Sequence, residues 1–337
     1  MKDKMNRREF LEQLAGWSGI ILAANLPEKA LAEVTRQTGN VQSLNIQSIT
    51  IPIGLPQPFK VLHISDTHLV RVDGRDDELK RKLAALRYDK YRWAEHCLNA
   101  AIEYAKDHHM PLVHTGDMYD FITEANLDLT ASYFKSANWI TAVGNHEFNI
   151  YLQEAPHDQA YKEKSIKEVQ SAFPNNIEFS SQVINGVNFI SLDNSFFKIS
   201  EKQWELFEKE TARQLPMVLL CHIPFYTPEH CRFNLGKTFR VGNMVGAPRE
   251  VTDTYKGKQG SSYTDIDKNG EWRKFRLSQR ADKTTLDFYH WLKENTLLKG
   301  ILCGHCHHFY QERFSPTAIE YCVGANFRGD AYEVTFS

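Results

Sequence analysis

Short apolar runs alternate along the chain with longer segments in which apolar residues recur every three or four positions. The short runs predict buried strands at residues 59–65, 111–115, 139–143, 177–182, 187–192, 217–221 and 298–303. The longer segments predict helices near residues 87–109, 123–136, 160–172, 200–213 and 283–295. The last 30 residues predict further short strands. This alternation predicts a layered α/β fold whose sheet is at least partly parallel.

Polar clusters follow five of the predicted strands directly. In chain order they read DTH (66–68), GDMYD (116–120), GNHE (144–147), CHIP (221–224) and GHCH (304–307). In open α/β sheets the chemistry gathers beyond the carboxyl ends of the strands. We therefore expect these five clusters to form one site.

The residue types in these clusters indicate a metal site. Carboxylate and amide oxygens combined with imidazoles suit Zn, Mn or Fe better than Ca or Mg alone. If His305 and His307 lie on an extended segment, they face the same way, with α-carbons about 6–7 Å apart. Paired hydrolytic metals lie about 3.5–4 Å apart, so each histidine can serve one metal. Asp117 follows Gly116, which permits a sharp turn and a carboxylate that bridges both metals.

The cysteines allow two interpretations. Six cysteines in 337 residues are too few for a fold built on disulfides. Cys303 and Cys306 form a C-x-x-C, which is either a redox or zinc pair or two small buried residues on a strand. No second C-x-x-C follows, and this favours the structural interpretation. Whether the two cysteines pair stays open.

The five motifs in this order resemble those of the calcineurin-like metallophosphoesterases, over residues 59 to about 310. The resemblance implies an α/β sandwich of central mixed β-sheets flanked by helices, with its site at the carboxyl ends of the strands. It implies two divalent metal ions, of Mn, Fe or Zn. The first would be bound by Asp66, His68, Asp117 and His307, and the second by Asp117, Asn145, His222 and His305.

The resemblance also implies a reaction. A metal-bound hydroxide would attack phosphorus in a phosphate monoester or diester, His146 would give a proton to the leaving oxygen, and Asp120 would orient His146. Phe121 stands where protein Ser/Thr phosphatases have an arginine, and Asp120 stands where purple acid phosphatases have a tyrosine. Both departures favour the broad bacterial group of phosphoesterases. The alternatives are a non-catalytic metal-binding module on this fold and a metallohydrolase of other substrates, such as amides.

The first 32 residues resemble a twin-arginine export signal. Arg7 and Arg8 precede an uncharged run at 14–26, and Ala-Leu-Ala at 30–32 is typical of a cleavage site. The run is shorter than the about 20 residues that span a bilayer. We expect residues 1–32 to direct export to the periplasm or cell envelope through the export machinery, and 33–337 to form one domain. The alternative is a retained amphipathic helix on a cytoplasmic protein, and Asn6 departs from the usual signal.

Charge bears on the substrate. The net charge of −2 gives no reason to expect a stable nucleic-acid partner. Within a predicted insertion at about 226–282, residues 231–280 hold eleven Lys/Arg against five Asp/Glu. We expect loops there that either hold a phosphorylated small molecule or a nucleotide-like substrate, or form a solvated surface. A second charged segment, 69–90, would belong to the same rim.

Overall fold

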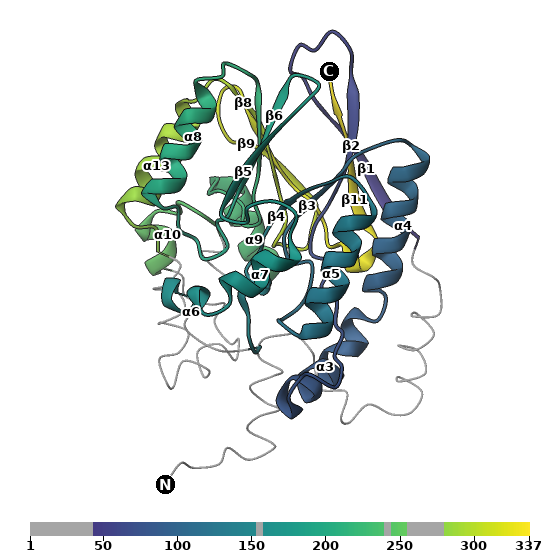
Figure 1. Ribbon diagram of the computed structural model, residues 1–337. Coiled ribbons are helices and arrows are strands. Elements are labelled where there is room, and N and C mark those ends of the chain that lie inside the picture. The colour runs from purple at the N-terminus through teal and green to yellow at the C-terminus, as the bar shows by residue number, and fades with distance from the viewer. Residues whose placement is uncertain (1–42, 153–157, 239–243, 255–279) are drawn as a thin grey trace.

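The computed structural model describes residues 43–152, 158–238, 244–254 and 280–337 (Figure 1). The predicted export signal lies outside the described residues, as do 239–243 and 255–279 of the predicted basic insertion. Within the described ranges, no helix is long and apolar enough to cross a membrane.

The described strands form two mixed sheets. The first has the order β1 (Asn45–Ile51), β11 (Asp330–Phe336), β2 (Phe59–Ile64), β3 (Leu112–Thr115) and β4 (Trp139–Ala142). The second has the order β5 (Phe179–Ile184), β6 (Val187–Leu192), β7 (Met217–Leu220), β8 (Leu298–Cys303), β10 (Ile319–Cys322) and β9 (Tyr310–Arg313). The strands that precede the polar motifs are parallel within each sheet, namely β2–β3–β4 and β7–β8. Their carboxyl ends therefore share one edge of the molecule.

Alternating side chains explain why the sheets stack. Val61 and Val113 pack with Val218 of the other sheet in a core between the two sheets. Their neighbours Leu62 and Leu112 point to the opposite face, as the period of two in a strand requires. The result is a core between the sheets and a further core beneath the helices on each outer face.

Helices cover both outer faces. Helices α4 (Ala94–Asp107) and α5 (Glu124–Ser136) cover the first sheet, whereas α8 (Glu201–Thr211) and α13 (Lys283–Glu294) cover the second (Figure 1). This arrangement of helix, sheet, sheet and helix confirms the predicted sandwich.

Some predicted elements differ in detail. The helix expected over 87–109 is two helices, α3 (Glu78–Tyr91) and α4, and the helix expected over 160–172 is also two, α6 (Gln159–Glu163) and α7 (Ile166–Ala172). The side chain of Asp77 accepts a hydrogen bond from the Lys80 amide and so starts α3 well before the apolar periodicity begins. Strand β1 was not predicted.

We expect loops throughout the basic insertion, but the structure shows two helices in it. It contains α9 (Pro228–Thr238) and α10 (Arg249–Thr254). Pro228 suits the first helical position, and Glu312 of β9 accepts from the backbone amide of His230 at 2.6 Å. Because the residue that satisfies this helix start lies on a distant strand, the local sequence gives no signal for it.

Candidate metal centre

Backbone hydrogen bonds hold the motif loops against one another beyond the strand ends. The amide of Asp66 donates to the Gly116 carbonyl at 2.9 Å, and the amide of Gly304 donates to the His222 carbonyl at 3.0 Å. The first bond joins the β2 and β3 loops, and the second joins the β7 and β8 loops. The structure thus brings together the motifs that the strand pattern predicted to meet.

Two motif glycines allow the loops to approach so closely. A β-carbon on Gly144 would lie 2.3 Å from Oδ1 of Asp117, and one on Gly304 would lie 1.9 Å from Oγ of Ser65. Both positions therefore exclude any side chain unless the neighbouring loop moves. The glycines of GNHE and GHCH thus serve to bring backbone and ligand side chains together.

One cluster joins the β2 and β8 loops. Nε2 of His68 lies 3.2 Å from Nε2 of His307, and Nε2 of His307 lies 3.0 Å from Oδ1 of Asp66. Nδ1 of His68 faces Oδ1 of Asp120 at 3.0 Å, which turns Nε2 toward the other members of the cluster. We call Asp66, His68 and His307 the first cluster, and their ligand atoms all lie within 4.8 Å of one another.

A second cluster joins the β3, β7 and β8 loops. Nε2 of His222 lies 3.1 Å from Oδ2 of Asp117 and 3.3 Å from Nδ1 of His305. Nδ1 of His222 donates to the Thr115 carbonyl at 2.8 Å, so Nε2 is the nitrogen turned to the cluster. Asp117, His222 and His305 form this second cluster, also within 4.8 Å.

Asp117 links the two clusters through one oxygen atom. Its Oδ2 lies 3.1 Å from His222 of the second cluster and 3.7 Å from His68 of the first. The other oxygen, Oδ1, accepts from the amide of His146 at 2.9 Å, which fixes the plane of the carboxylate. This placement suits a carboxylate that bridges two cations.

The donors fit divalent cations on grounds independent of the sequence pattern. Oδ1 of Asn145 and Oδ1 of Asp66 are buried without a hydrogen-bond partner in the described structure. Buried polar atoms are normally satisfied, so such atoms need a ligand. Burial also lowers the pKa of His68 to about 4 and that of His305 to about 3, which keeps these imidazoles neutral as metal binding requires.

The pKa of His222 indicates that the buried Asp117 carboxylate needs a positive charge beside it. Burial alone would lower its pKa, but Asp117 outweighs burial and raises the pKa of His222 to about 10. In the metal-free protein a proton on His222 therefore balances the buried carboxylate. A cation bound by both residues would take over that role and release the proton.

The ligand loops are not extended, contrary to our expectation for His305 and His307. Five of the seven predicted ligands have left-handed backbone, with φ between 53° and 68°: Asp66, His68, Asp117, His305 and His307. Residues other than glycine adopt this conformation at a conformational cost of about 1–3 kcal/mol each where the surroundings impose it. The two histidines still point into different clusters, but a tight left-handed turn directs them rather than the pleat of a strand.

His146 lies beside the first cluster, with Asp120 behind it. Nδ1 of His146 donates to the Asp120 carbonyl at 2.5 Å and lies 3.3 Å from Oδ1 of the same residue. Burial opposes charge on His146, but Asp117 and Asp120 outweigh it and raise its pKa. His146, His68 and Asp117 also come within 4.8 Å, so the geometry permits either a proton donor or a ligand at this position.

Sequence reasoning missed Arg87. From α3 its Nε donates to Oδ2 of Asp120 at 2.6 Å and its Nη2 donates to Oδ1 at 2.9 Å. Burial would raise the pKa of Asp120. The charge of Arg87 and hydrogen bonds from His146, His68 and Arg87 outweigh burial and hold the pKa of Asp120 well below the usual range. Arg87 thus keeps Asp120 anionic beneath His68 and His146.

Replacing Arg87 by methionine is expected to lower the free energy of unfolding by about 1–3 kcal/mol, because a buried carboxylate loses its bidentate partner. Activity should fall about 10–100-fold, as is typical when a group behind a ligand is lost. Urea denaturation and steady-state kinetics measure the two effects. Lys82→Met removes a charge from the exposed face of the same helix and should change neither. A fully active, fully stable Arg87→Met variant would contradict this role.

The sequence pattern predicts no specific function for Glu147 of the GNHE motif. Its carboxylate accepts from the amides of Asp117 at 2.8 Å, Met118 at 2.6 Å and Gly144 at 2.6 Å. It therefore ties the β4 loop to the β3 loop. Burial and the neighbouring Asp117 raise the pKa of Glu147 to about 7.

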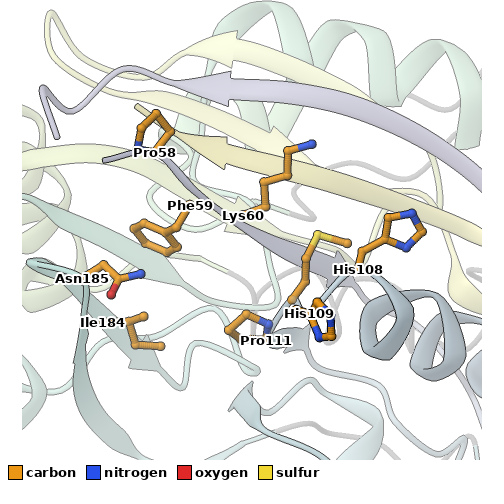
Figure 2. A pocket seen from close by; sticks show the side chains of 9 residues that line it. Pro58, Phe59, Lys60, His108, His109, Pro111, Ile184 and Asn185 are labelled. Atoms are coloured by element: carbon orange, nitrogen blue, oxygen red, sulfur yellow. The ribbon is translucent and has the colours of Figure 1, made fainter. Parts of the chain in front are cut away.

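A separate hollow of about 510 Å³ lies at the opposite ends of the strands (Figure 2). It is lined by residues that begin β2 or precede β3, among them Phe59, Lys60 and Pro111, together with His108 of the preceding turn and Ile184. None of the predicted site residues lines it, so we do not connect it with the metal centre.

Comparisons with known proteins agree with this geometry at the level of the family. The sequence model of the calcineurin-like phosphoesterases matches residues 59–327. A search of curated protein sequences gives no match to this chain.

Three solved structures show 12% identity to the chain. A dimetal phosphatase from Danio rerio has a TM-score of 0.46, over 80% of this chain and 88% of that one. A phosphopantetheinyl hydrolase from Mycobacterium tuberculosis has a TM-score of 0.37, over 80% and 90%. A 5′-nucleotidase from Candida albicans has a TM-score of 0.36, over 85% of this chain and 48% of that one.

The family match covers most of the chain and all five motifs, which the fold has gathered at one edge. The protein is therefore a member of the calcineurin-like phosphoesterase family of metal-dependent hydrolases.

Proposed function

We propose that the protein is a two-metal hydrolase of phosphate esters. The observation that carries this proposal is the single oxygen of Asp117, which faces a cluster of ligands on either side. One cation would be held by Asp66, His68, His307 and Asp117. The other would be held by Asp117, Asn145, His222 and His305. Bound divalent ions would offset the charge of a phosphoryl group and lower the pKa of a water molecule to about 7.

The chain's own residues would then orient the substrate and move a proton. His146 lies at the rim of the centre with about a fifth of its side chain exposed, whereas Asp120 behind it is fully buried. His146 would give its proton to the ester oxygen as the bond to phosphorus breaks, so that water and ester yield an alcohol and a phosphate. Asp120 keeps Nδ1 occupied, which leaves Nε2 as the nitrogen that faces the substrate.

Two cationic residues mark where the phosphate would enter. Burial lowers the pKa of His307 well below the usual range, and the nearby charges of Lys90 and Arg328 lower it further. Arg328 also donates to the His307 carbonyl. Lys90 belongs to the second charged segment, so we propose that this segment contributes to the substrate rim. A phosphorylated small molecule or nucleotide-like ester is the substrate class that this rim and the basic insertion favour.

We also propose that residues 1–32 form a twin-arginine export signal and that 33–337 are the mature domain. The support is the arginine pair before an uncharged run and a small-residue cleavage site. Fractionation of the producing cells and N-terminal sequencing of the protein test this. An uncleaved cytoplasmic protein would contradict it.

The function is tested by metal analysis of protein purified without chelator, combined with turnover of p-nitrophenyl phosphate and bis(p-nitrophenyl) phosphate. We expect divalent metal at the centre and hydrolysis of at least one ester, with activity lost on chelation and restored by Mn²⁺. A panel of p-nitroanilide amides is the control for a different hydrolase. Metal-loaded protein that cleaves neither ester would favour the non-catalytic module instead.

A further inference from the structure

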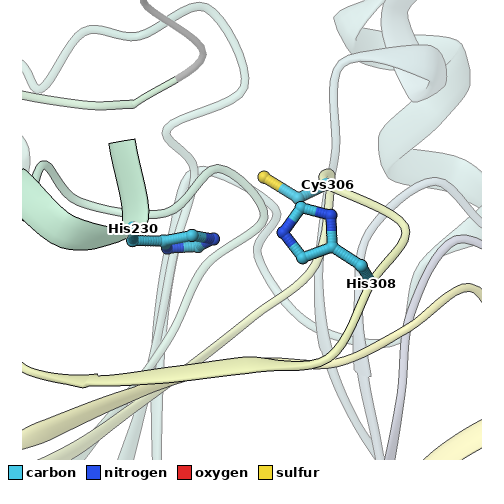
Figure 3. Close-up of side chains that lie close together, drawn as sticks. All are labelled: His230, Cys306 and His308. Atoms are coloured by element: carbon cyan, nitrogen blue, oxygen red, sulfur yellow. The ribbon is translucent and has the colours of Figure 1, made fainter. Parts of the chain in front are cut away.

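A third group of ligand side chains lies outside the metal centre. His230, Cys306 and His308 place one nitrogen or sulfur atom each within 4.8 Å of one another. His230 comes from α9, whereas Cys306 and His308 come from the loop between β8 and β9 (Figure 3). None of the three was assigned to the binuclear clusters, so a second function for the GHCHH segment has to be considered.

The loop after β8 divides its side chains between two places. His305 and His307 belong to the binuclear clusters, and their immediate neighbours Cys306 and His308 belong to the third group. The left-handed conformation of His305 and His307 turns the chain at every second residue and makes this division possible. Two separate sets of ligands are thus built on four consecutive residues.

The backbone of His230 is held by a hydrogen bond, and a carboxylate lies near its ring. Glu312 accepts from its backbone amide at 2.6 Å, and Oε1 of Glu320 lies 3.6 Å from its Nδ1. Its Nε2 is buried and has no hydrogen-bond partner among the described residues. A carboxylate at one ring nitrogen and a cation at the other is the usual arrangement of a zinc-bound histidine.

The described residues shield most of the group from solvent. His230 and Cys306 are buried and His308 is half-buried. The Tyr310 ring stacks on His230 with centroids 4.3 Å apart, and the Phe233 ring lies 5.1 Å from that of His308. A closed, largely apolar setting of this kind is typical of structural rather than catalytic metal sites.

The donor set selects the metal. Two imidazoles and one thiol suit Zn²⁺ and are poor ligands for Ca²⁺ or Mg²⁺. Cys322 of β10 lies outside this group of three, and its sulfur donates to the Gly304 carbonyl at 3.1 Å, next to the residue pair His305 and Cys306. Cys303, Cys306 and Cys322 are free thiols. If the Cys322 thiol left the Gly304 carbonyl for a bound ion, the group would have the composition of a tetrahedral Cys₂His₂ site.

We propose that His230, Cys306 and His308 bind a structural zinc ion, with Cys322 as the fourth ligand. The ion would join α9 of the basic insertion to the loop that carries His305 and His307. It would thereby hold two ligands of the binuclear centre in position without touching the substrate. This site is independent of the proposed reaction, because none of its ligands takes part in that reaction.

Cobalt substitution tests the proposal with a signal that the binuclear centre cannot give. A thiolate ligand gives Co²⁺ an intense near-ultraviolet charge-transfer absorption, and every predicted ligand of the binuclear centre is oxygen or nitrogen. The full chain, kept reduced, is depleted of metal and titrated with Co²⁺ and then with Zn²⁺. We expect the absorption to appear with Co²⁺ and to disappear as Zn²⁺ displaces it.

Variants assign the ligands. Cys306→Ser and His308→Ala should each lose most of the absorption and about one equivalent of zinc per chain. Cys231→Ser is the matched control, because Cys231 neighbours His230 on α9 but lies outside the group. Folded wild-type protein without the absorption would overturn the proposal, even if the variants fail to fold. An absorption lost in Cys231→Ser but kept in Cys306→Ser would also overturn it.

Discussion

Replacing Asp117 by alanine is expected to remove metal from both clusters of the binuclear centre and to lower kcat/KM by about 10³-fold or more. The reason is that one oxygen of Asp117 lies 3.1 Å from His222 and 3.7 Å from His68, so both clusters lose the same anionic ligand. His222 also loses the carboxylate that balances its charge. Metal analysis of the purified variant and turnover of the better p-nitrophenyl ester measure the two effects.

Asp128→Ala provides the control for Asp117→Ala. Asp128 is an exposed carboxylate on α5 that pairs with Arg75, and its loss should leave metal content and activity unchanged. Near-ultraviolet circular dichroism shows whether Asp117→Ala is folded. A folded variant with the same metal content per chain as the wild type would refute the bridging role.

Replacing His146 by glutamine is expected to lower kcat by about 10²–10⁴-fold while metal content stays unchanged. Glutamine fills similar space and can still donate to the Asp120 carbonyl, but it cannot supply a proton to a leaving oxygen. The effect should shrink for esters with better leaving groups, because an oxygen that leaves as a stable anion needs no proton. Kinetics on a series of substituted phenyl phosphates measure this dependence.

Metal content separates the two roles that the geometry permits for His146. Because His146 also lies within ligand distance of His68 and Asp117, a variant that loses metal would identify a ligand rather than a proton donor. His96→Gln, an exposed substitution on α4, should behave like the wild type. Full activity in His146→Gln would exclude both roles.

The sequence was sufficient to predict the parts of the fold that carry the motifs. Strands β2, β3, β7 and β8 are short, mainly apolar segments that end where the motifs begin, and their parallel pairing follows from the helices between them. Burial on both faces leaves few ways to arrange such strands. For this reason the edge at which the predicted ligands meet could be inferred before their geometry was known.

Contacts between distant residues could not be predicted. Strand β1 has a polar, alternating sequence and is stabilised by pairing with β11 at the other end of the chain. Arg87 reaches Asp120 from a helix whose Leu79 and Leu86 are exposed, so no apolar stripe indicated which face is inward. Glu147 acts on backbone amides, and a side chain that binds backbone has no fixed partner in the sequence.

The backbone conformation of the ligand residues could not be predicted from their spacing in the sequence either. An i, i+2 spacing such as that of His305 and His307 is typical of a strand, and only the structure shows the left-handed turns. The same spacing leaves Cys306 and His308 pointing away from the binuclear centre. The structure thus gives the histidine-rich segment two sets of ligands where the sequence indicated one.

The left-handed backbone at five ligand positions has a consequence for protein engineering. A redesign that rewarded thermal stability alone would favour glycine or asparagine at these positions, because both adopt positive φ with less strain. Such a variant would have less backbone strain but would lose the side chains that bind the metal ions. A mutant library designed to raise thermal stability should therefore keep these five residues unchanged. Stabilising substitutions should be sought on the exposed helix faces instead.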